Sequence, residues 1–171
     1  ILATTQRNFR QDWLELGRSS NTRRVVCVKN TGKEYEELVE DVLLNKSNSL
    51  FERQVFIGIK PNKKTKHYVD ILLIEKSEVV SLKYQGCSGT AEEKIPYEVL
   101  VLQHQINKGK CKTATIVLGG DGWTQADWYL EEGFCDKMNC PNVNIITHDT
   151  FMKEYTNVDL PLSRGLEGLF A

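Results

Sequence analysis

The segment from His67 to Tyr84, HYVDILLIEKSEVVSLKY, most constrains the fold, because its alternation predicts two strands joined by a tight turn. Asp70 lies in a row of the first strand that should otherwise belong to the core, and Lys83 lies near the end of the second strand. Burying an acid and a lysine costs free energy unless they neutralise each other, bind a metal or take part in catalysis. Asp70 and Lys83 are therefore the first candidates for a functional site.

This pair resembles the signature of the PD-(D/E)XK nuclease superfamily, to which many type II restriction endonucleases belong. The superfamily has an acid on one strand and an acid-x-lysine tripeptide that ends the next strand. Asp70 matches the first acid and Lys83 matches the lysine, whereas Ser81 stands where the tripeptide has its acid. A subset of the restriction enzymes keeps Ser-x-Lys and takes the missing carboxylate from the helix that follows.

The segment after the second strand, QGCSGTAEEKIPYEV, offers three glutamates for that carboxylate. Thr90 and Glu93 have the spacing of a capping box, which gives Glu93 a structural role. Glu92 and Glu98 flank the apolar stripe of the helix on opposite sides, and we favour Glu92 with Glu98 next. Pro96 could reverse this order, because proline disfavours a helix interior and favours a first helical position.

The resemblance implies a site for one or two Mg²⁺ ions. Asp70, a helix glutamate and the backbone carbonyl of Leu82 would be its ligands, and Lys83 would position the attacking water. We also expect Ser81 to hold a metal-bound water and Gln85 to contact the scissile phosphate or a base.

The segment from Thr31, TGKEYEELVEDVLLNK, predicts an amphipathic helix whose early glutamates suit the helix dipole. In the superfamily, a helix that opens with Gly-x-x-aromatic-Glu often contributes an acid near the metal. Gly32, Tyr35 and Glu36 resemble this pattern, so Glu36 is either a further metal ligand or an ordinary solvated glutamate.

The order of the predicted elements indicates an α/β fold with a restriction-endonuclease-like core (αβββαβ), in which helices flank a central mixed sheet. We expect a single domain over residues 1–171, with an N-terminal helix and loop (1–30), a catalytic core (31–148) and a C-terminal helix and tail (149–171). Beyond the helix from Thr31 and the strand pair, the expected elements are a strand at 54–59, a helix to about 107, a strand at 113–119, a short helix at 124–132, a strand at 142–147 and a closing helix at 148–155.

Charge is nearly balanced, with 22 basic and 23 acidic residues, so any DNA binding must come from local patches. The turn KPNKKTK contains four lysines and no acid. It is either a solvated turn or a contact to the DNA backbone. The candidate DNA contacts are Lys60, Lys63, Lys64, Lys66, His67, Arg23 and Arg24, where His67 has a structural role as its alternative.

Composition is that of a globular protein, with 40% hydrophobic and 26% charged residues, and no apolar run is long enough to span a membrane. We therefore expect a soluble, cytoplasmic protein.

The five cysteines are odd in number and scattered, which favours free thiols. Cys135, Cys140 and His148 are a weaker alternative, a zinc site without a second ligand pair.

Together these patterns predict a Mg²⁺-dependent DNA endonuclease that hydrolyses phosphodiester bonds. The resemblance favours a type II restriction enzyme that cuts double-stranded DNA at a short specific site as a homodimer. One alternative is a catalytically weakened nuclease fold that binds DNA or a protein partner, because Ser81 replaces an acid. Another is an unrelated α/β domain in which Asp70 and Lys83 form a structural ion pair.

Overall fold

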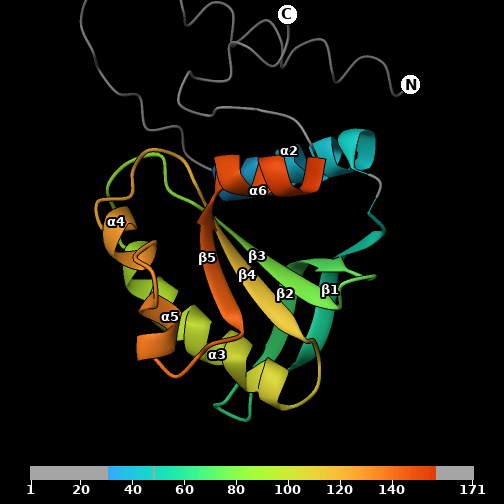
Figure 1. Cartoon of the computed structure of the whole chain (residues 1–171), viewed down its shortest axis with the longest axis vertical. Coiled ribbons are helices and arrows are strands. Elements are labelled where there is room, and N and C mark those ends of the chain that lie inside the picture. Colours follow the sequence, from blue (N-terminus) through green and yellow to red (C-terminus); the bar gives the residue numbers. More distant parts are fainter. Residues whose placement is uncertain (1–30, 48, 157–171) are drawn as a thin grey trace, which may run out of the picture.

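The computed structural model describes residues 31–47 and 49–156 (Figure 1). Its elements in chain order are α2 (Thr31–Lys46), β1 (Phe51–Ile59), β2 (Lys66–Leu73), β3 (Glu78–Tyr84), the 3₁₀ turn η1 (Glu92–Lys94), α3 (Ile95–Asn107), β4 (Thr113–Gly119), α4 (Ala126–Tyr129), α5 (Phe134–Lys137), β5 (Val143–Thr147) and α6 (His148–Thr156).

The strands form one mixed sheet in the order β1-β2-β3-β4-β5. β2 is antiparallel to both β1 and β3, whereas β4 is parallel to both β3 and β5. Parallel neighbours need a crossover, and α3 supplies the one between β3 and β4. The predicted α/β class and the αβββαβ order are therefore confirmed.

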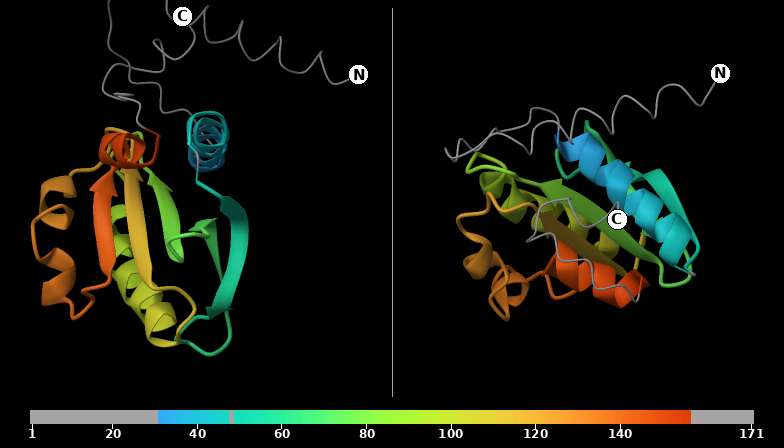
Figure 2. Two further views of the ribbon diagram at one scale, coloured as in Figure 1. Left: turned by 45° about the vertical axis from the view of Figure 1, so that its right-hand side comes forward. Right: turned by 90° about the horizontal axis from the view of Figure 1, so that it is seen from above.

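Helices cover both faces of the sheet, and each face has its own apolar core. Val80 packs with Leu43 of α2 and Phe151 of α6, whereas Val79 packs with Val99 of α3. Figures 1 and 2 show α2 and α6 together on one side of the strands and α3 on the other. Successive side chains of β3 therefore enter opposite cores, and both Val79 and Val80 are fully buried.

The β2–β3 hairpin opens into a fork beside Asp70. Backbone pairing runs from Leu73 and Glu78 to Ile71 and Val80 and stops there. From that point β3 stays paired with β4 over its whole length, while β2 stays paired with β1. The fork leaves room for side chains between two strands of the same sheet.

Two local expectations need correction. The helix predicted at 124–132 is only the single turn of α4, and α5 follows it as a second short helix. The expected capping box of Thr90 and Glu93 does not form, because η1 has Ala91 as its N-cap without a side-chain hydrogen bond. Pro96 lies in the first turn of α3, which is the alternative that its chemistry favoured.

The cysteines also depart in part from expectation. Cys111, Cys135 and Cys140 are free, but Cys87 is disulfide-bonded, so the prediction of free thiols was wrong for that residue. The alternative zinc site does not form. Within residues 31–47 and 49–156, His, Cys, Asp and Glu side chains make no group of three suited to a metal ion, and His148 Nδ1 instead bonds the Tyr35 hydroxyl at 2.9 Å.

Arg23, Arg24 and the rest of the expected N-terminal helix and loop lie outside the described residues, as does the tail from 157. No helix in the described part of the chain combines the length and apolar character needed to cross a membrane.

Gly119 at the end of β4 tests the packing of α2 on the sheet. A Cβ atom there would overlap the ring of Tyr35, which is buried and hydrogen-bonded to His148. We expect Gly119→Ala to lower the free energy of unfolding by about 1–3 kcal/mol, measured by urea denaturation. The control is Gly32→Ala in α2, where a Cβ would meet no atom within 4 Å and should stabilise by up to about 1 kcal/mol. Equal effects would contradict this account of the packing.

Candidate active site

Asp70 lies at the point where the hairpin opens. Its Oδ2 accepts a hydrogen bond of 2.7 Å from the backbone N–H of Leu82, so a side chain replaces the backbone ladder here. Burial raises the pKa of Asp70, although the Lys83 ammonium and the Leu82 N–H both act to lower it. The carboxylate is thus anchored in a setting that disfavours its charge, and a nearby cation would stabilise it.

Glu98 of α3 reaches the fork from the other side of the sheet. Its Oε1 accepts a 2.8 Å hydrogen bond from the Ser81 hydroxyl and lies 3.5 Å from Lys83 Nζ. Burial acts to raise the pKa of Glu98, but the nearby His67 ring, the Lys83 charge and the Ser81 hydroxyl outweigh it and lower that pKa to about 2. Glu98 is therefore a carboxylate, 14% exposed, that stays ionised at neutral pH.

Ser81 and Lys83 share one face of β3, since they are two residues apart. Ser81 is buried, so it contacts Glu98 inside the protein. Lys83 is partly exposed, so its side chain reaches the solvent-exposed edge of the fork. Ser81 stands where the superfamily pattern has an acid. The carboxylate of Glu98, from the helix that follows β3, lies against Ser81.

Glu36 brings α2 into the same cluster. Burial raises the pKa of Glu36, the negative charge of Asp70 raises it further, and Lys83 lowers it. Glu36 is half-buried, and its Oε2 accepts a hydrogen bond from the Gln54 side chain, which also reaches Asp70. Glu40, one turn further along α2, is buried and pairs with Arg53 at 2.8 Å.

Gln54 of β1 joins Glu36 to Asp70 and was not predicted. Its side-chain Nε2 lies 3.3 Å from Glu36 Oε2 and 3.4 Å from Asp70 Oδ1. The register pairs the residues on either side of Gln54 with Ile71 and Val69, which puts Gln54 opposite Asp70. Its backbone has a positive φ of 49°. The residue alternation of β1 would have indicated Gln54 only if the register with β2 had been known.

Glu92 and Gln85 lie in a different polar cluster. The Glu92 carboxylate accepts hydrogen bonds from the N–H and hydroxyl of Thr124 and from the N–H of Gln125. The Gln85 side chain donates to the carbonyl of Gly122 at 2.8 Å. Both side chains thus form hydrogen bonds with the backbone of the loop that follows β4. The helical phase used to favour Glu92 fails, because η1 is a separate 3₁₀ turn and α3 begins only at Ile95.

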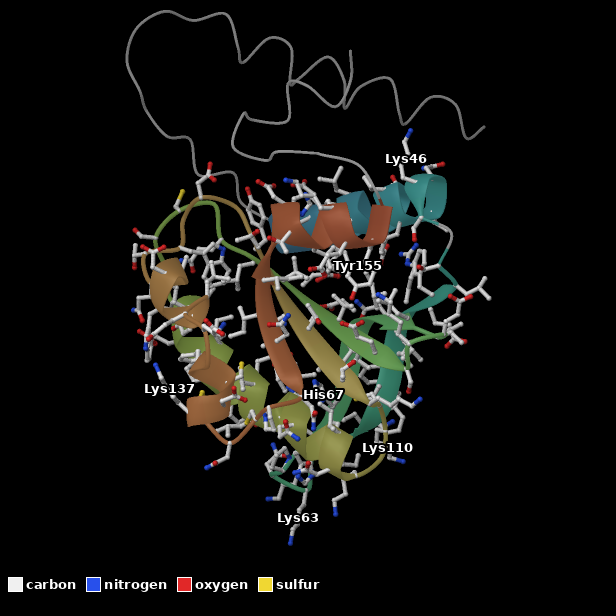
Figure 3. The ribbon with its side chains drawn as sticks, viewed as in Figure 1. Lys46, Lys63, His67, Lys110, Lys137 and Tyr155 are labelled. Atoms are coloured by element: carbon white, nitrogen blue, oxygen red, sulfur yellow. The ribbon has the colours of Figure 1, made fainter. Side chains whose placement is uncertain are left out.

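His67 and the lysines of the turn differ in their exposure to solvent. His67 is 2% exposed with its Nε2 3.9 Å from Glu98 Oε1, which favours the structural role over the DNA contact. The turn itself is ordered by Asn62, whose Oδ1 accepts the N–H groups of Lys64 and Thr65. Figure 3 shows Lys63 projecting from its tip. The exposed lysines of the turn are Lys63, Lys64 and Lys66, and Lys60 is half-buried.

A family model described as "PD-(D/E)XK nuclease superfamily domain" matches residues 21–157, a range that includes every described residue. The chain belongs to the PD-(D/E)XK nuclease superfamily. The resemblance inferred from Asp70 and Lys83 is thus confirmed, and nuclease chemistry follows at the level of the family. Comparisons with curated proteins and with solved structures found no match.

Nucleases of the PD-(D/E)XK superfamily generally use divalent metal ions. Asp70 and Glu36 come close enough to share a single donor, the Gln54 amide, and Asp70 still has a raised pKa because of burial. Carboxylate oxygens are the ligands that Mg²⁺ prefers. These two acids are therefore of the right chemical kind, but within residues 31–47 and 49–156 they belong to no group of three side chains suited to a metal ion.

The low pKa of Glu98 predicts acid sensitivity of this PD-(D/E)XK domain. Its folded pKa of about 2 lies below the ordinary value of 4.5, so the stability it contributes is present above pH 4.5 and is lost as the pH falls towards 2. We expect Glu98→Gln to remove about 3 kcal/mol at neutral pH and to flatten the pH dependence of unfolding in that window. Urea denaturation across pH 2–6 measures this. The exposed Glu93→Gln is the control, and an unchanged slope in Glu98→Gln would refute the prediction.

Proposed function

We propose that this nuclease domain is a divalent-metal-dependent endodeoxyribonuclease, with Mg²⁺ as the metal and double-stranded DNA as a substrate. The observation that carries the proposal is the contact of the Glu98 carboxylate with Ser81 and Lys83. It supports Glu98 as the relocated acid of a Ser-x-Lys site, with Asp70 as the first acid.

In this proposal Asp70 and Glu98 hold the metal, with Glu36 and the backbone carbonyl of Leu82 as further ligands. A bound divalent ion lowers the pKa of water and screens charge that develops on the phosphate. Lys83 reaches the mouth of the fork, where its ammonium orients the attacking water and stabilises negative charge on the phosphate oxygens.

Ser81 and His67 act through Glu98. The Ser81 hydroxyl donates its hydrogen to Oε1, and the His67 ring lies behind the same oxygen, so both restrict where the carboxylate points. We therefore assign Ser81 the positioning of Glu98 in place of the expected metal-bound water. Neither residue needs to touch the substrate.

We further propose that the domain acts as a type II restriction enzyme, as a homodimer on a short two-fold site. Support comes from the Ser-x-Lys pattern that it shares with a subset of these enzymes. A two-fold site would let each protomer cut one strand. Cleavage of plasmid DNA into discrete fragments, together with a dimer in sedimentation, is the result that this proposal requires.

A nuclease fold that binds DNA without efficient turnover is the second candidate. It is favoured by the engagement of one Glu98 oxygen with Ser81, Lys83 and His67, which competes with metal ligation. Plasmid cleavage with Mg²⁺ but not with EDTA supports the first candidate. A gel shift with Ca²⁺ and no cleavage with any divalent metal supports the second.

Asp70→Asn and Lys83→Ala should each lower cleavage by orders of magnitude while the fold is kept. The Asn side chain can still accept the N–H of Leu82, and it removes a charge whose pKa is raised by burial. We therefore expect the unfolding free energy of Asp70→Asn at pH 7 to be equal to the wild-type value or up to about 2 kcal/mol higher. Cleavage rates and thermal unfolding are measured on the same samples. Normal cutting by either variant would mean that the proposed centre is misplaced.

The choice between the helix glutamates predicts different responses to metal. Glu98→Gln should cut slowly and need a higher Mg²⁺ concentration for half-maximal rate, because it removes a ligand. Glu92→Gln should need the ordinary Mg²⁺ concentration, since the Glu92 carboxylate serves the loop at Thr124. A titration of cleavage against Mg²⁺ compares the two variants at matched folded fractions. A metal phenotype in Glu92→Gln alone would return the role to that residue.

A further inference from the structure

Two aromatic side chains stand exposed on the β1–β2 ribbon next to the fork. Phe56 is 50% exposed and Tyr68 is 51% exposed, and their ring centroids are 5.5 Å apart. The sheet register pairs the two residues across the strands. Exposed aromatic side chains that share one surface commonly serve recognition.

The aromatic pair lies next to Gln54 and Asp70 along the β1–β2 ribbon. Gln54 and Asp70 are joined across the same two strands, and Phe56 and Tyr68, which pair with each other, lie two residues further along each strand. Two residues of a strand span ~6.6 Å. That length is comparable to the spacing of successive nucleotides in an extended strand.

Positive charge follows the aromatic pair. β1 ends and β2 begins within a few residues of Phe56 and Tyr68, and the turn between the strands carries exposed lysines and no acid. Asp70, the two aromatic side chains and the lysines thus follow one another along a single ribbon. Of these groups, the lysines complement a phosphate backbone, and the aromatic faces complement the faces of nucleobases.

We propose that Phe56 and Tyr68 form a stacking platform for an unpaired base of the nucleic acid substrate, one nucleotide away from the phosphate at Asp70. This inference rests on the proposed nuclease function and specifies its substrate. Bases inside a duplex have their faces covered by neighbours, so the platform requires single-stranded DNA or a base that has left the stack. Stacking tolerates every base, so the platform contributes affinity without sequence readout.

Two further aromatic side chains are exposed within the described part of the chain. Trp128 lies on α4, where its ring packs against Tyr129 and Phe134. Tyr97 is 49% exposed and lies on α3, not on the β1–β2 ribbon. Tyr97 therefore provides a matched control.

The test is a binding measurement that does not depend on cleavage. Fluorescence anisotropy in Ca²⁺ compares a single-stranded thymidine oligomer of ~12 nucleotides with an abasic oligomer of the same length. The proteins are the wild type, Phe56→Ile/Tyr68→Ile, its two single variants, and Tyr97→Leu. Isoleucine keeps apolar bulk and strand propensity but has no aromatic face. The single variants keep the test decisive if the double variant fails to fold.

We expect the wild type to bind the base-bearing oligomer about tenfold or more tightly than the abasic one. The isoleucine variants should lose most of that preference, and Tyr97→Leu should keep it. Replacing Lys63, Lys64 and Lys66 with glutamine should weaken both oligomers equally and flatten the salt dependence.

The proposal is overturned if the wild type shows no preference for bases, or if the preference survives in the folded isoleucine variants. It is also overturned if those variants change only the sedimentation of the protein, since the pair would then be a contact between copies. Cleavage of DNA with Mg²⁺ is measured separately. Cleavage without a base preference would refute the platform and leave the nuclease proposal intact. A base preference without cleavage would refute the nuclease proposal and leave the platform intact.

Discussion

The site depends on one buried interaction, the contact of the Glu98 carboxylate with Ser81, Lys83 and His67. An ionised carboxylate at this depth would be unstable alone, and these donors together lower its pKa to about 2. The same donors come from β2 and β3 while Glu98 comes from α3. The interaction therefore ties the crossover helix to the two strands that carry the remaining acid and lysine.

The fork between β2 and β3 makes that arrangement possible. If the hairpin stayed paired, the N–H of Leu82 would bond a backbone carbonyl, but it bonds the Asp70 side chain instead. The opened strands keep their partners on the outer sides, β1 and β4, so the sheet remains continuous. The gap admits polar groups from both faces, Glu36 from α2 and Glu98 from α3. The candidate site thus lies between two strands of a sheet that is otherwise continuous from β1 to β5.

Most of the fold was predictable from the sequence because its elements are strongly patterned. The amphipathic stripe from Thr31, the alternation of β2 and the apolar run of β4 all became the expected elements. The site was predictable only in part. Asp70, Ser81 and Lys83 stand out within one hairpin, whereas Gln54 becomes visible only when the register of β1 is known. Polar residues whose partners are distant in the chain carry no local signal.

The sequence by itself determined the α/β order of elements and the presence of an acid and a lysine on one hairpin. Only the tertiary structure decided that Glu98, and not Glu92, lies against Ser81 and Lys83. The helical phase cannot be carried through the break between η1 and α3, which turns Glu92 to the loop at Thr124. It also decided that His67 lies behind Glu98. Such choices depend on how α3 packs against the fork, and packing joins residues that no short-range pattern relates.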